Sequence, residues 1–157
     1  MLKTTNNSVV FTEVPDEVSL AINISNCPIK CSNCHSKFLW NDEGDVLNWE
    51  LLRSLILKND GITCVCFLGG DSEPASINAL AKLIKEFFNL KVAWYSGRDN
   101  LSPEISLKYF DFVKLGSFVK YPLNDQRTNQ KFYKVEDHKL TDITYKFWKD
   151  YGKSESN

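Results

Sequence analysis

The sequence lacks an excess of either charge, a long apolar run and a secretory signal. Its 157 residues carry 19 Lys and Arg against 20 Asp and Glu, a balance that does not favour bulk electrostatic binding to nucleic acid. The longest apolar run, residues 62–68, is far shorter than the roughly 20 residues of a transmembrane helix. Residues 1–8 lack the charged and apolar regions of a secretory signal. We therefore expect a cytoplasmic protein that does not enter the membrane.

Cysteine is unevenly placed along the chain. Of the five cysteines, three fall within eight residues and the other two are one residue apart. An odd number in this layout is poorly suited to paired disulfides, so it indicates metal or redox chemistry instead. Cys64 and Cys66 alternate along an apolar segment, and we expect both on one face of a strand, in the core.

The pattern of apolar residues predicts alternating strands and helices. Hydrophobic residues make up 43% of the chain, which is typical of one globular domain, here expected over residues 1–151 with a polar tail at 152–157. Helices are expected after Asn48 and Pro74, and strands at residues 9–12, 18–25, 62–68, 91–95 and 111–115. This alternation predicts parallel βαβ units and an α/β fold. A closed eight-fold barrel needs about 250 residues, so a partial barrel or open sheet is expected.

Three cysteines carry the strongest chemical signal. Cys27, Cys31 and Cys34 have the spacing C-x3-C-x2-C on a loop that follows a predicted strand. Three thiolates on one short loop can bind a single soft metal centre, and iron–sulfur clusters favour thiolate ligands. Three protein ligands leave one metal position open for a substrate or cofactor, which is typical of catalytic sites.

Two other interpretations of these cysteines are open. His35 could complete a zinc site, although adjacent residues seldom direct both side chains at one ion. Cys31 and Cys34 could form a thioredoxin-like pair, which leaves Cys27 unexplained.

The cysteine motif and several segments beyond it resemble the radical S-adenosylmethionine superfamily. Cys34-His35 is similar to the end of the cysteine loop in activators of glycyl radical enzymes, and residues 67–74 (FLGGDSEP) resemble their strand and glycine segment. Residues 94–97, 111–116 and 128–133 are similar to the small activating proteins of anaerobic ribonucleoside-triphosphate reductase. The similar segments occur in order from about residue 18 to residue 135.

This resemblance implies a fold, an activity and partners. The fold would be a partial (β/α) barrel of the radical SAM type with a mostly parallel sheet, formed by residues 1–151. Cys27, Cys31 and Cys34 would hold a [4Fe-4S] cluster whose fourth iron binds S-adenosylmethionine. Reductive cleavage of that cofactor would generate a glycyl radical on the anaerobic reductase, with electrons from a donor such as flavodoxin or ferredoxin.

The residues expected to bind the cofactor are Asn33, Cys34, His35, Gly69, Gly70, Asp71, Ser96 and Lys114. Ser96 and Lys114 are candidates because they lie at the carboxyl ends of predicted strands, where α/β folds place ligands. Asn33 stands where many members have an aromatic residue. Asp71 replaces the usual Glu of the glycine segment, with Glu73 two residues later, so either carboxylate could serve.

Two alternative functions follow from the same residues. One is activation of another glycyl radical enzyme, of the pyruvate formate-lyase type. The other is a zinc-binding interaction module without catalysis.

Overall fold

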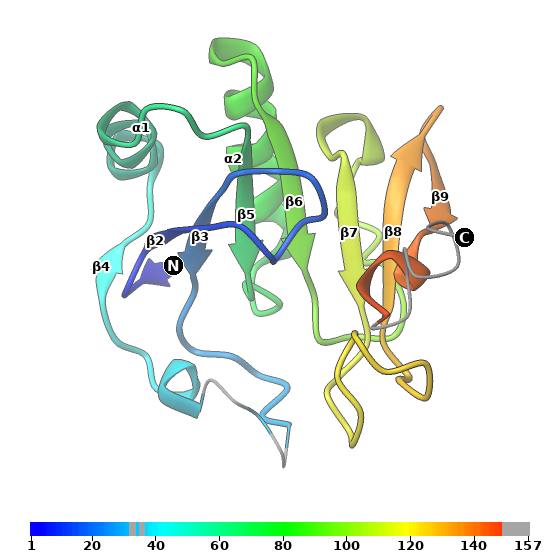
Figure 1. Ribbon diagram of the computed structural model, residues 1–157. Coiled ribbons are helices and arrows are strands. Elements are labelled where there is room, and N and C mark those ends of the chain that lie inside the picture. Colours follow the sequence, from blue (N-terminus) through cyan, green and yellow to red (C-terminus); the bar gives the residue numbers. More distant parts are fainter. Residues whose placement is uncertain (32–33, 35–36, 149–157) are drawn as a thin grey trace.

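The computed structural model describes residues 1–31, 34 and 37–148, and its centre is a seven-stranded sheet (Figure 1). The strand order is β2-β3-β5-β6-β7-β8-β9. These strands are β2 (Ser8–Val10), β3 (Ser19–Asn23), β5 (Cys64–Leu68), β6 (Lys91–Tyr95), β7 (Phe112–Leu115), β8 (Lys131–Glu136) and β9 (Lys139–Asp142). A separate antiparallel pair joins β1 (Lys3–Thr4) to β4 (Asp45–Val46).

Two α-helices form where the sequence predicts them. In α1 (Trp49–Lys58), the Asn48 side chain accepts a hydrogen bond from the Leu51 N–H at 2.9 Å, so it caps the first turn. Pro74 opens α2 (Pro74–Phe87), where its missing N–H costs nothing. Short 3-10 helices complete the structure: η1 (Lys37–Trp40), η2 (Leu107–Tyr109) and η3 (Thr144–Phe147). Neither α-helix in the described part of the chain has the length and hydropathy needed to cross a bilayer.

The sheet is mixed, which corrects the expected fold class. β3, β5, β6 and β7 pair in parallel, whereas β2 with β3, β7 with β8, and β8 with β9 pair antiparallel. The prediction of a mostly parallel sheet in a partial (β/α) barrel of the radical SAM type is therefore wrong.

Two features of the chain account for this difference. The connection from β6 to β7 contains only the three-residue η2 in place of an α-helix. After β7 the chain forms a hairpin, turning at Asp137 and His138, whose φ angles of 50° and 61° suit a tight hairpin turn. Asp-His is a weak hairpin signal beside Asn-Gly or Asp-Gly, so no hairpin was expected here.

Alternation along the central strands divides the core between the two faces of the sheet. Val65 and Phe67 of β5 face the cluster that contains Ile77 and Ile84 of α2. Cys64 and Cys66 point to the opposite face, where they pack in a second cluster with buried residues that include Phe132. Both thiol side chains are fully buried, which confirms the prediction that they are core residues on one face.

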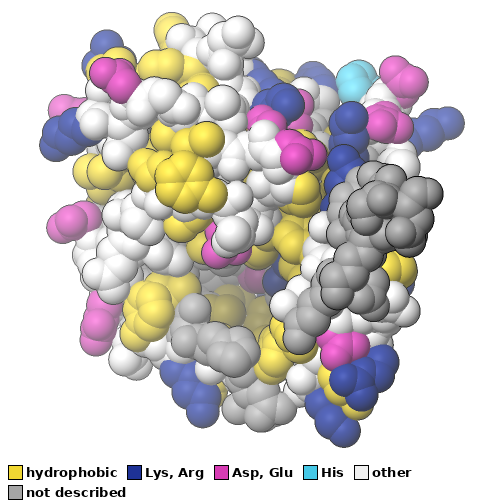
Figure 2. Space-filling model, in the orientation of Figure 1, with side chains coloured by type: hydrophobic (Ala, Val, Ile, Leu, Met, Phe, Trp, Pro, Cys, Tyr) yellow, Lys and Arg dark blue, Asp and Glu magenta, His cyan; other side chains and the backbone are white. Residues whose placement is uncertain are grey.

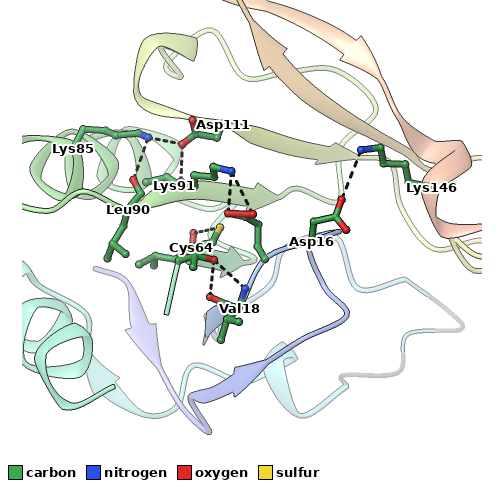
Figure 3. Close-up of polar contacts among 12 residues, drawn as sticks. Asp16, Val18, Cys64, Lys85, Leu90, Lys91, Asp111 and Lys146 are labelled. Atoms are coloured by element: carbon green, nitrogen blue, oxygen red, sulfur yellow. Dashed lines mark hydrogen bonds and ion pairs between the residues drawn. The ribbon is translucent and has the colours of Figure 1, made fainter. Parts of the chain in front are cut away.

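Polar contacts tie the amino ends of the parallel strands together (Figure 3). Lys85 of α2 pairs with Asp111, and it also donates to the Leu90 carbonyl oxygen at 3.1 Å. The Asp111 carboxylate accepts the Val92 N–H at 2.9 Å, so one side chain links the starts of β6 and β7 to α2. The opposite, carboxyl ends of β5, β6 and β7 meet the cysteine loop and the β7–β8 loop (Figure 1).

Candidate functional site

A cavity of about 440 Å³ lies at the carboxyl ends of the parallel strands. Six of the predicted site residues line it: Cys27, Cys34, Gly69, Asp71, Ser96 and Lys114. Its other walls come from the N-terminal segment, η1 and the β7–β8 loop. Figure 2 shows apolar side chains deep in the lower middle of this face, with Lys and Arg side chains at the lower left and lower right. Parallel strands place ligand sites at this end because their connecting loops converge there.

The cysteine loop borders the cavity. Cys27 is anchored by its N–H, which donates to the Leu39 carbonyl oxygen at 2.9 Å, and the Cys34 N–H donates to the Cys31 carbonyl oxygen at 3.0 Å. All three cysteines are half-buried. Asn33 and His35, which the sequence also predicts for this site, lie outside the described residues.

The chemistry of this donor set fits a [4Fe-4S] cluster. Thiolate is the ligand type that such clusters take, and two of the three thiols line a cavity that a further ligand could enter. Among the described residues, no three His, Cys, Asp or Glu side chains are gathered closely enough to hold one metal ion. The fit therefore rests on the type and number of the thiols and on their place beside the cavity.

Asp71 joins the ends of two strands. Its Oδ1 accepts the Ser96 hydroxyl at 2.5 Å and its Oδ2 accepts the Gly97 N–H at 2.9 Å. Asp71 and Ser96 are both buried, so these hydrogen bonds satisfy groups that water does not reach freely. Glu73, the other carboxylate considered, pairs instead with the Met1 amino group at 2.5 Å. The structure thus brings Asp71, rather than Glu73, to the cavity.

The two glycines after β5 play different parts. Gly69 lines the cavity, and its carbonyl oxygen accepts the Trp94 indole N–H at 2.7 Å while its N–H donates to the Tyr95 carbonyl oxygen at 3.1 Å. Gly70 faces the core, because a Cβ there would lie 2.7 Å from Cδ1 of Ile77. Both glycines have positive φ, 103° and 95°, a region that favours glycine.

Lys114 brings a positive charge to the cavity wall. Its ammonium lies 4.9 Å from the centre of the Tyr95 ring, and within the described chain it has no carboxylate at ion-pair distance. Burial lowers the pKa of Lys114, while nearby acidic groups, Cys31 first among them, act to raise it. The Tyr95 hydroxyl donates to the Glu13 carbonyl oxygen, and burial raises the Tyr95 pKa well above its ordinary value.

Sequence reasoning missed part of the wall. Glu13 and Asn23 are polar residues of the lining, and Phe118 and Leu123 are apolar ones. Asn23 ends β3, so its position at the carboxyl end of a parallel strand was a usable signal. The other three lie on irregular segments, where no periodicity marks the side that faces a cavity.

Comparison with known proteins identifies one family. No curated protein and no solved structure matches the chain. The sequence model of a family described as a 4Fe-4S single cluster domain matches residues 18–134, which include the whole cysteine loop and the four strands β3, β5, β6 and β7 that border the cavity. Since this match covers most of the chain and agrees with the donor set, the protein belongs to the family of 4Fe-4S single cluster domains.

Proposed function

We propose that this protein is a radical SAM enzyme that activates anaerobic ribonucleoside-triphosphate reductase by generating its glycyl radical. The observation that carries the proposal is the ligand-sized cavity beside the three-cysteine loop. Its volume of about 440 Å³ lies in the range of roughly 300–1,000 Å³ that is usual for small-molecule sites. Three thiolate ligands leave one iron of a [4Fe-4S] cluster open toward such a site.

The cavity wall suits a zwitterionic nucleoside ligand such as S-adenosylmethionine. Lys114 offers a positive charge to a carboxylate. Leu68, Phe118 and Leu123 provide apolar surface for a nucleobase and exclude water. A bound cluster would supply the electron that cleaves the carbon–sulfur bond of this cofactor.

The partner assignment rests on the resemblance in sequence. Residues 128–133 are similar to the small activators of the anaerobic reductase, and a cavity open to solvent needs a partner to shield reactive chemistry. We infer that the glycine-bearing segment of the reductase covers the opening, and that a reduced flavodoxin or ferredoxin supplies electrons.

Metal analysis and spectroscopy test the proposal in two steps. Anaerobic reconstitution should give about four iron atoms per chain, and dithionite-reduced protein should cleave S-adenosylmethionine slowly. Adding the anaerobic reductase should then produce a glycyl doublet in the electron paramagnetic resonance spectrum. A reductase whose radical glycine is replaced by alanine is the matched control and should give no doublet.

Three results would contradict the proposal at different levels. One zinc per chain and no iron would support a non-catalytic zinc module. Iron without cofactor cleavage would leave only cluster binding. A doublet on pyruvate formate-lyase, with none on the reductase, would move the partner to another glycyl radical enzyme.

A further inference from the structure

The cysteine loop rests on the sheet through one close contact. Ile29, which lies between Cys27 and Cys31, packs directly against the backbone of Gly97 at the end of β6. A Cβ built on Gly97 would lie 2.9 Å from Cγ1 of Ile29, 3.2 Å from its Cβ and 3.3 Å from its Cγ2. The absence of a side chain at Gly97 therefore decides how near the loop can approach.

Backbone conformation does not require glycine at this position. The glycines with positive φ are Gly44, Gly61, Gly69, Gly70 and Gly116, and Gly97 is not one of them. An alanine could adopt the backbone conformation of Gly97, so its cost would come from the contact with Ile29. Ile29 is β-branched and stiff about χ1, and both of its γ-carbons take part in the contact. A rotation about χ1 leaves at least one γ-carbon facing Gly97, so the loop backbone would have to move.

Gly97 itself is held firmly. Asp71 accepts its N–H at 2.9 Å and the neighbouring Ser96 hydroxyl at 2.5 Å. The Ser96 N–H donates to the Lys114 carbonyl oxygen at 2.9 Å, which joins β7 to the same unit. Because the ends of three strands are linked in this way, the surface under Ile29 cannot easily yield.

We propose that Asp71 and Gly97 are positioning residues that seat Ile29 and thereby set the placement of the cysteine loop over the cavity. Their role is to hold the loop in the arrangement from which its thiols bind the cluster. The inference goes beyond the proposed function, because it applies to cluster binding whatever reaction the cluster supports. Partners that orient metal-binding elements typically change metal affinity by about 10–100-fold when they are altered.

A size-complementation experiment tests the contact. The measurement is the rate at which reconstituted protein loses iron to a ferrous chelator, together with the electron paramagnetic resonance spectrum of the reduced cluster. Gly97→Ala should lose iron about tenfold faster than the unaltered protein and should show an altered cluster spectrum. Adding Ile29→Ala removes both γ-carbons that meet the new Cβ. The double variant should therefore have a rate of iron loss and a cluster spectrum close to those of the unaltered protein.

Ile29→Val is the matched control. It also shortens the side chain, but it keeps the Cβ, Cγ1 and Cγ2 atoms that lie nearest to Gly97. The double variant with Gly97→Ala and Ile29→Val should therefore lose iron as fast as Gly97→Ala alone. Equal rescue by valine and alanine would overturn the proposal, because it would show that these γ-carbons do not cause the effect.

Asp71→Ala gives a second test that does not enlarge any side chain. Alanine removes both oxygens that accept the Gly97 N–H and the Ser96 hydroxyl, so the support under Ile29 loosens and iron loss should again accelerate. Thermal melting of each variant reports whether it is folded. If folded Asp71→Ala and folded Gly97→Ala both retain iron like the unaltered protein, the proposal is wrong. Should Gly97→Ala not fold, Asp71→Ala alone decides.

Discussion

At the scale of single residues, the five cysteines fall into two chemical groups. Cys27, Cys31 and Cys34 are half-buried on a loop beside a cavity, whereas Cys64 and Cys66 are fully buried among apolar side chains. Burial raises the pKa of Cys64 to about 12 and that of Cys66 well above its ordinary value. Both core thiols therefore stay protonated and unreactive at neutral pH, while the loop thiols are open to a metal.

Substitution should separate the two groups. Cys27→Ala, Cys31→Ala and Cys34→Ala should each abolish stable cluster assembly, because two remaining thiolates hold a four-iron cluster poorly. Cys64→Ser and Cys66→Ser should keep the full iron content and lower the free energy of unfolding by about 1–3 kcal/mol, since each buries a hydroxyl. Iron analysis and urea denaturation measure the two effects. Loss of iron in either serine variant would contradict the assignment to the core.

Gly70 should be sensitive for a reason of packing. In Gly70→Val the new Cβ would lie 2.7 Å from Cδ1 of Ile77, and the backbone would be held at a φ of 95°. Overpacking and strain together should lower the free energy of unfolding by about 2–4 kcal/mol. Gly61→Val is the control, because its φ of 85° is similar and no atom lies within 4 Å of the added Cβ. An equal loss in both variants would show that the overlap with Ile77 costs nothing.

At the scale of elements, one carboxylate makes polar contacts with both α2 and the sheet. Asp111 pairs with Lys85 and accepts the Val92 N–H, so Asp111→Ala removes a charge pair and leaves a backbone donor without its partner. We expect the free energy of unfolding to fall by about 1–3 kcal/mol. The control is Glu136→Ala, whose ion pair with Lys134 is about half exposed on both sides and should contribute about 0–1 kcal/mol. Chemical denaturation compares the two, and similar losses would contradict the prediction.

The same elements explain how the site is assembled. β5, β6 and β7 are parallel and end at one edge, so Asp71, Ser96 and Lys114 come together although they are far apart in sequence. The antiparallel hairpin of β8 and β9 then closes one side of the sheet. Between β7 and β8, the loop supplies Phe118 and Leu123 to the cavity wall.

At the scale of the whole molecule, buried thiols should lower the stability of the protein at alkaline pH. The Cys64 pKa is raised from 9.0 to about 12 by burial, so between these values the unfolded chain binds fewer protons than the folded one. The free energy of unfolding should therefore fall as pH rises above 9, by up to about 1.4 kcal/mol per pH unit for one thiol. Cys64→Ala removes this titration, so its stability should fall less steeply from pH 9 to pH 11. Parallel curves for the two proteins in thermal or chemical unfolding would contradict the prediction.

The sequence by itself determined the local elements and the kind of chemistry. Asn48 and Pro74 mark the starts of the two α-helices, and apolar alternation marks the central strands, because capping and periodicity depend only on neighbouring residues. The spacing of Cys27, Cys31 and Cys34 indicated a metal centre with an open position, and the match to a 4Fe-4S single cluster domain agrees with iron–sulfur binding.

Only the tertiary structure decided how strands pair and which polar groups meet. β2 and the hairpin of β8 and β9 join the parallel core as antiparallel strands, so the sheet is mixed and not the predicted mostly parallel barrel. Asp71, and not Glu73, lies at the cavity because its carboxylate bonds to Ser96 and Gly97, which follow the next strand. The contact of Gly97 with Ile29 likewise joins two loops whose approach no local pattern encodes. Pairing and packing between remote segments are set by the free energy of the whole folded chain, which local sequence patterns do not contain.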